Sequence, residues 1–179
     1  MQDIEQLKYP VGTLSFPDAY DPDLIGEQIG VIADFPAKLR AAVESLSPEQ
    51  LAWVYRPEGW TIRQVVHHCG DSHCNALTRF KLALTEDNPT IRPYHEALWS
   101  ELPDAHLNEL EDSLQLLTGL HSRWAKLLRT MNKEQWNRTL VHPEHGRVFT
   151  LFEMAEMYSW HCRHHLAHVY QALEHKGQF

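Results

Sequence analysis

Residues 150–177, TLFEMAEMYSWHCRHHLAHVYQALEHKG, have the pattern of one long α-helix. Thr150 is followed three residues later by Glu153, the capping-box spacing that satisfies two backbone amides at the start of a helix. Gly177 supplies a stop signal at the other end. Apolar residues recur at helical spacing in between: Met154, Tyr158, Cys162, Val169 and Leu173. The segment therefore predicts a helix that ends near residue 175 or 176 and buries one face.

Three more segments show helical periodicity. The first spans about 21–43, and Pro36 inside it should kink or split the helix because proline lacks a backbone amide proton. The second spans about 61–85 and opens with a capping box at Thr61. The third runs from about 103 or 104 to about 131 with leucines every three or four residues. Four long helices predict an all-α, four-helix bundle.

The connections complete this picture of a single domain over residues 1–179. Residues 1–20 contain two prolines and little periodicity, which predicts an extended N-terminal arm. Residues 89–103 contain three prolines and form a long crossover loop, a kind of segment that is often functional. Residues 139–149 alternate and contain a His-Gly pair, so a small hairpin fits there.

Composition excludes several classes of function. The net charge of -8 argues against nucleic acid and against an anionic membrane surface as partners. The sequence contains no eighteen consecutive apolar residues, so it predicts no membrane span. The polar, acidic start MQDIEQLKYP lacks the basic and then apolar order of a signal peptide. The three cysteines show no disulfide framework, which favours a reducing compartment and a cytoplasmic protein.

Histidines are the unusual feature, with thirteen in 179 residues. His161 and His165 are four residues apart, so their rings project from one face of the last helix within reach of one ion. His164 and His168 form a second such pair, turned by about 100°. The apolar stripe lies nearer the first pair, which predicts the second pair at the boundary or in solvent.

A catalytic zinc site needs a third protein ligand from another element. The second helix offers His67, His68 and His73, and geometry alone favours His68 over His67 only slightly. Three neutral imidazoles suit zinc or nickel and leave coordination positions open for a water that loses its proton easily. Asp71, one turn after His68, is a candidate for orienting a ligand or accepting a proton.

The motifs GWTIRQVVHHCGDSH (59–73) and WHCRHHLAH (160–168) resemble those of the DinB-like superfamily of metal-binding four-helix bundles. YRPEGWTIRQVVHH and RFKLALTEDNPTIRPY are similar to its YfiT-like branch. The resemblance extends from about Tyr9 to His175. In that family a histidine follows the helix-opening tryptophan by eight residues. Counted from Trp60 this is His68, and the family's HxxxH pair falls on His161 and His165.

The resemblance implies a function as well. Members of the branch are provisionally named metal-dependent hydrolases, which implies an enzyme that binds one divalent metal ion per subunit and activates a bound water toward a small-molecule substrate. Some relatives transfer bacillithiol, a low-molecular-weight thiol, so a metal-dependent thiol S-transferase is the alternative. A metal-binding stress protein without enzymatic activity is the third hypothesis. The resemblance also implies a cytoplasmic homodimer.

Other residues have both a functional and an ordinary interpretation. Arg79, Lys81, Arg92 and Tyr94 lie in or beside the crossover loop and could hold an anionic substrate, although surface charge and loop packing explain each as well. Three large aromatics could line a pocket or simply pack: Trp60, Trp99 and Trp160. Tyr158 could stabilise an oxyanion. Cys69 is predicted to be a buried, inert thiol where relatives have an aliphatic residue. The remaining histidines are assigned surface or structural roles: His73, His142, His145 and His175.

Overall fold

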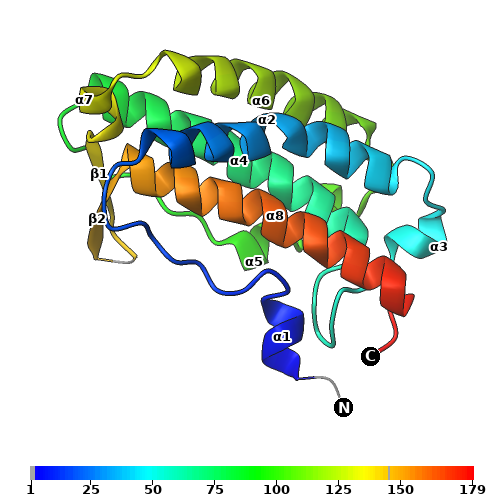
Figure 1. Ribbon diagram of the computed structural model, residues 1–179. Coiled ribbons are helices and arrows are strands. Elements are labelled where there is room, and N and C mark those ends of the chain that lie inside the picture. The colour runs from blue at the N-terminus through cyan, green and yellow to red at the C-terminus, as the bar shows by residue number, and fades with distance from the viewer. Residues whose placement is uncertain (1–2, 145) are drawn as a thin grey trace.

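Four long helices form the body of the molecule in the computed structural model, which describes residues 3–144 and 146–179. They are α2 (Pro22–Val43), α4 (Ile62–Thr85), α6 (Glu111–Thr130) and α8 (Leu151–His175). Helix α2 packs against α6 and α8, and α4 packs against the same two helices (Figure 1). The predicted four-helix bundle is confirmed, and each of its helices touches two neighbours in the order α2, α6, α4, α8.

Short elements connect and cap the bundle. They are α1 (Ile4–Lys8), α3 (Pro48–Leu51), α5 (Glu96–Trp99), the 3-10 helix η1 (Pro103–His106) and α7 (Lys133–Trp136). Strands β1 (Thr139–His142) and β2 (Arg147–Thr150) pair antiparallel, so the predicted hairpin is present. Its turn contains His145, which lies outside the described residues. The crossover loop between α4 and α6 holds α5 and η1, and Thr90 in this loop bridges to Val141 of β1.

The core lies between the four helices, and the capping boxes predicted at Thr61 and Thr150 start α4 and α8. The largest fully buried side chains come from all four helices, the hairpin and α7: Phe35, Ile32, Leu39, Ile62, Phe80, Leu117, Trp124, Leu128, Trp136, Leu140, Leu151 and Met154. Lys176 and Gly177 end α8 with positive φ angles of 53° and 68°. Among the described residues, no helix combines the length and apolar character that a bilayer crossing requires.

The N-terminal arm is not wholly extended as the sequence predicts, because residues 4–8 form helix α1. The Asp3 carboxylate caps this helix by accepting a hydrogen bond from the Glu5 amide at 3.0 Å. Leu7 is buried, and its carbonyl accepts from the Gln171 amide of α8 at 2.9 Å. A single apolar contact and one cap are too weak a periodic signal for the sequence to show.

Helix α6 starts at Glu111, later than the predicted 103 or 104. The preceding carbonyls are bonded to side chains of α4, which removes them from a helical ladder. The His67 Nε2 atom lies 3.1 Å from the Leu107 carbonyl, and Arg63 donates to the His106 carbonyl at 3.4 Å. Leu107 is half exposed, so its place in the leucine pattern does not place it in the core.

Helix α2 is not split at Pro36. Proline cannot donate to the carbonyl four residues earlier, so the Ile32 carbonyl lacks its helical partner. The side chain of His121 on α6 fills this position, with Nδ1 lying 2.5 Å from the Ile32 oxygen.

Candidate metal centre

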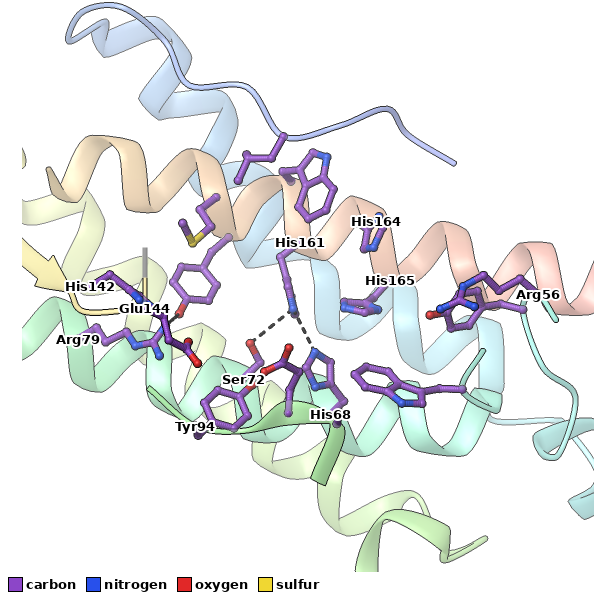
Figure 2. A pocket seen from close by; sticks show the side chains of 18 of the residues that line it. Arg56, His68, Ser72, Arg79, Tyr94, His142, Glu144, His161, His164 and His165 are labelled. Atoms are coloured by element: carbon purple, nitrogen blue, oxygen red, sulfur yellow. Dashed lines mark hydrogen bonds between the residues drawn. The ribbon is translucent and has the colours of Figure 1, made fainter. Parts of the chain in front are cut away.

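Three imidazole rings from two helices converge on one wall of a pocket. His68 comes from α4, and His161 and His165 lie one turn apart on α8. One potential ligand nitrogen from each lies within 4.8 Å of the other two. Figure 2 shows the His161 and His68 rings turned toward one another, with His165 beside them. The capping boxes at Thr61 and Thr150 set where α4 and α8 start.

The spacing of the nitrogens fits a metal ion. The Nε2 atoms of His68 and His161 are 3.2 Å apart. Two nitrogens at about 2.0–2.1 Å from one tetrahedral zinc ion lie roughly 3.3 Å from each other. The Ser72 hydroxyl lies 3.5 Å from the same His161 nitrogen. The two imidazole nitrogens therefore have the separation of two ligands that share an ion.

The electrostatics of the cluster also fit a cation. Burial lowers the pKa of His68 to about 4. Burial, and after it the neighbouring imidazoles, holds the pKa values of His161 and His165 well below the usual value. All three rings are therefore neutral at pH 7, and neutral imidazole is the form that binds zinc, nickel and similar ions.

The pocket beside the cluster has a volume of about 650 Å³. This is within the range of small-molecule sites. Indole rings of Trp60 and Trp160 line it, as do the carboxylates of Glu58, Glu96 and Glu144, all exposed. The carboxylates went unnoticed in the sequence because they come from three separate segments, one of them helix α5, and share no spacing with the histidines.

A buried guanidinium lies in the same pocket. Arg79 of α4 is 8% exposed, and its Nη1 donates to the Tyr158 hydroxyl at 3.0 Å. Within residues 3–144 and 146–179 no ion pair involves Arg79, and its buried Nε has no hydrogen-bond partner. Burial raises the pKa of Tyr158, so its hydroxyl stays protonated. The Tyr158 ring lies 6.1 Å from that of His161, which places the pair next to the cluster.

The structure brings only some of the predicted residues to the pocket. The residues that line it are Arg79, Tyr94, Tyr158, Trp60 and Trp160. Arg79 and Tyr94 are labelled in Figure 2. Four other candidates are absent from its lining: Asp71, Lys81, Arg92 and Trp99. Burial and then the charge of Asp104 raise the pKa of Asp71, and His67 acts in the opposite direction, so the surroundings of Asp71 are the η1 side of α4. Lys81 and Arg92 are exposed.

The second histidine pair is buried, contrary to the prediction of a boundary or solvent position. His164 is 8% and His168 is 2% exposed. Trp160 stacks on His164 at 4.2 Å between ring centroids, and Tyr55 stacks on His168 at 3.7 Å. The His168 Nε2 donates to the Lys8 carbonyl at the end of α1, 3.1 Å away. Trp160 is a local neighbour on α8, but Tyr55 and Lys8 cover His168 from segments far away in sequence, which helix periodicity cannot predict.

The cysteines take no part in the cluster. Cys69 and Cys162 are buried and Cys74 is half-buried, and all three are free thiols. Burial raises the pKa of Cys69 and of Cys162, which keeps both sulfurs in the thiol form that binds metal poorly.

A helical bundle with two histidine-bearing helices around one pocket defines a class of metal-binding four-helix bundles. The family model of the DinB superfamily matches residues 32–169, and the chain belongs to this superfamily.

Two relatives sharpen the placement. The chain is 45% identical over 163 residues to YfiT of Bacillus subtilis, which is provisionally named a metal-dependent hydrolase, and the match covers 91% of this chain and 92% of the relative. A relative from Oceanobacillus iheyensis with the same provisional name is 46% identical over 162 residues, covering 90% and 93%. A solved structure of Bacillus subtilis YfiT superposes with a TM-score of 0.93 at 43% identity, covering 96% of this chain and 98% of that one. That structure is described as an unusual four-helix bundle topology. The predicted resemblance is confirmed.

Proposed function

We propose that this protein is a metal-dependent hydrolase of a small anionic molecule, with one divalent ion per chain held by His68, His161 and His165. The observation that carries the proposal is the convergence of three neutral imidazoles on the wall of a pocket, with two nitrogens 3.2 Å apart. The provisional names of the relatives support the reaction class. Zinc and nickel are the ions that we expect, because imidazole suits both.

A divalent ion held by three neutral ligands supplies Lewis acidity, keeps open coordination positions and lowers the pKa of coordinated water toward neutrality. The protein's own residues supply the rest. The reaction also needs a proton acceptor, and the pocket lining offers the carboxylates of Glu58, Glu96 and Glu144 as candidates, whereas it does not include Asp71. The indole rings of Trp60 and Trp160 exclude bulk water from part of the wall, which strengthens electrostatic interactions inside.

Arg79 and Tyr158 define the substrate class. A guanidinium that is buried without a counter-ion costs free energy, and an anionic group of the substrate would remove that cost. Because the Tyr158 oxygen accepts a hydrogen bond from Arg79, its own proton is free to be donated to a substrate oxygen. We therefore expect substrates with a carboxylate or phosphate near the bond that is cleaved.

The experiment compares two esters on the zinc-loaded protein: p-nitrophenyl acetate, which is neutral, and mono-p-nitrophenyl succinate, which has a carboxylate. We expect zinc-dependent hydrolysis that favours the carboxylated ester. Arg79→Gln should lower kcat/KM for that ester by about 10- to 100-fold, the value of one buried charge-assisted contact. Arg92→Gln is the matched control, since it removes the same charge from an exposed side chain outside the pocket. Equal rates with and without zinc would contradict a hydrolase of this kind.

A second candidate function is a metal-dependent thiol S-transferase. Three imidazoles leave the full positive charge of the ion, which favours binding of a small thiol as its thiolate and needs no protein base. The test is to incubate the metal-loaded protein with bacillithiol and a bimane electrophile. Metal-dependent conjugation without ester hydrolysis would replace the hydrolase by the transferase, and stoichiometric metal with neither activity would support a binding protein.

We also propose a homodimer in the cytoplasm, on the strength of the family resemblance. Light scattering on the purified protein should give twice the 20.8 kDa mass of the chain. A mass equal to that of one chain at micromolar concentration would contradict the dimer.

A further inference from the structure

A backbone carbonyl without its helical partner lies in the centre of the bundle. Pro36 lies inside α2 and has no amide proton to offer the Ile32 carbonyl, one turn earlier. Ile32 has no exposed surface, so water cannot easily supply the missing donor. The Nδ1 atom of His121, from α6, lies 2.5 Å from this oxygen. A carbonyl oxygen only accepts hydrogen bonds, so the Nδ1 of His121 must be the protonated nitrogen.

This proton assignment passes to the next ring. His121 has no exposed surface, and burial lowers its pKa to about 4, so it is neutral and has one ring proton. Its Nε2 must therefore accept. His73 of α4 has its Nδ1 2.8 Å away and must be the donor. His73 is fully buried too, and both of its hydrogen-bond partners are imidazoles rather than carboxylates, so it is also neutral with one ring proton.

The same reasoning reaches His161. Since His73 uses its single proton on Nδ1, its Nε2 can only accept, and it lies 3.0 Å from the Nδ1 of His161. The Nδ1 of His161 is therefore the donor, and its Nε2 is unprotonated, with a lone pair that accepts from Nε2 of His68 at 3.2 Å and that a metal ion could take instead. The hydrogen-bond chain from Ile32 to His121, His73 and His161 crosses α2, α6, α4 and α8 in the order in which these helices pack.

We propose that His121 and His73 are positioning residues, which fix the proton of His161 on Nδ1 and hold its Nε2 ready for the metal ion. This inference rests on the proposed metal site. The hydrogen-bond chain begins at the Ile32 carbonyl, which is a free acceptor because Pro36 has no amide proton. The proline at which the sequence predicts a break therefore supplies the first acceptor of this chain. Neutral imidazole in water favours the proton on Nε2, so without the chain the ligand nitrogen of His161 would more often be blocked.

Aromatic packing holds the rings of the hydrogen-bond chain in place. The Phe35 ring lies 5.3 Å from that of His73 and 5.6 Å from that of His121, measured between centroids. Trp124 lies 5.6 Å from the ring of His121. Rings held by buried aromatic neighbours cannot flip to present the other nitrogen without opening the core. A metal-ligating histidine whose second nitrogen donates to a fixed partner is the usual arrangement in metal sites, and loss of such a partner costs about 10- to 100-fold in metal affinity.

The first test needs no variant. Long-range proton–nitrogen correlation spectra of the zinc-loaded, full-length protein report which ring nitrogen has the proton. His73 is not one of the proposed ligands, and its two ring nitrogens contact His121 and His161, so its tautomer reports the direction of the hydrogen-bond chain. We expect protons on Nδ1 of His73 and His121, and a proton on Nε2 of His73 would overturn the proposal. If the protein binds no zinc, the proposed metal site is contradicted. The same spectra of the metal-free protein would still show whether His73 and His121 have their protons on Nδ1.

The second test measures zinc affinity by competition with a chelator. His121→Phe should weaken zinc binding about 10- to 100-fold, and His121→Gln should restore most of it because a side-chain amide has both a donor and an acceptor. His67→Phe is the matched control: His67 is buried on α4, makes two hydrogen bonds and lies next to His68, but it is outside the chain. Equal losses in His121→Phe and His67→Phe, or no rescue by glutamine, would overturn the proposal. Should His121→Phe not fold, the glutamine variant and the spectra decide.

Discussion

Two histidine pairs of identical spacing lie on α8, and their surroundings differ. His161 and His165 meet His68 of another helix, and beyond His161 the hydrogen-bond chain continues through His73. His164 and His168 also lie close together, and with His165 they form a second trio of nitrogens within 4.8 Å of one another. All three of that trio come from one helix. Two HxxxH pairs with the same spacing therefore have different roles, because only one of them faces a histidine from another helix.

The partners of the rings show how the two pairs differ. His168 uses Nε2 on the Lys8 carbonyl, and stacking on Tyr55 holds its ring. The Nδ1 atoms of His164 and His168 are buried without partners, so they are the rival position for an ion. His164 also lines the pocket, but only the first pair has a ligand from α4 opposite it and a further layer of hydrogen bonds through His73. We assign the second pair to packing between α8 and the N-terminal segment.

The largest expected effect separates the two pairs directly. His161→Ala removes one of three ligands, and the zinc dissociation constant should rise on the order of 100-fold or more. His164→Ala is the matched control from the other pair, and zinc binding there should change by less than about threefold because no ligand is lost. Chelator competition at pH 7 measures both. Similar losses in the two variants would remove the distinction between the pairs.

Acid sensitivity gives the next largest effect. Burial lowers the pKa of His168 to about 3, below its ordinary value near 6.5. The unfolded chain therefore binds a proton between about pH 6.5 and 3 that the folded chain does not, so stability rises with pH and is lost as pH falls through this window. Between pH 7 and 5 this one group costs roughly 2 kcal/mol.

The measurement is urea unfolding of the metal-free protein at pH 7, 6 and 5. His168→Phe should lose about 2 kcal/mol less than the natural protein over that range, whatever its stability at pH 7. If the free energy of unfolding changes equally with pH in the natural protein and in His168→Phe, then His168 is protonated as easily in the folded protein as in the unfolded one.

The smallest expected effect concerns Tyr55, whose ring stacks on His168 of the second pair. Tyr55→Leu removes the ring stacked on His168 and should lower the free energy of unfolding by about 1 kcal/mol, the value of a stacked aromatic pair beyond its buried area. Zinc affinity should not change, because the ring touches neither His161 nor His68 in the described contacts. Thermal denaturation of zinc-loaded and metal-free protein checks both statements. A weakened zinc affinity would link the second pair to the metal.

Sequence predicted what local periodicity encodes and missed what distant segments supply. The capping boxes at Thr61 and Thr150 and the stripes of α4 and α8 placed the helices correctly. The start of α6 was wrong because side chains of α4 bind the carbonyls of residues 106 and 107. The burial of His168 was wrong because its cover comes from Lys8 and Tyr55.

The candidate site shows the same limit. The pair on α8 follows from spacing, and the choice of His68 over His67 needed the family resemblance. The structure gives a physical reason for that choice: His67 bonds to Ser113 and to the Leu107 carbonyl on the other side of α4. Its neighbour His68 faces α8. The link from Pro36 through His121 could not be predicted, since it joins four helices whose packing order is not written in any local pattern.

The most direct test is an anomalous-scattering map, at the zinc absorption edge, of crystals of the full-length protein loaded with zinc. The account predicts one peak per chain, within about 2.0–2.1 Å of Nε2 of His161 and of a ring nitrogen of both His68 and His165. A peak bound by His164 and His168 instead, or no peak at His68 and His161, would contradict it.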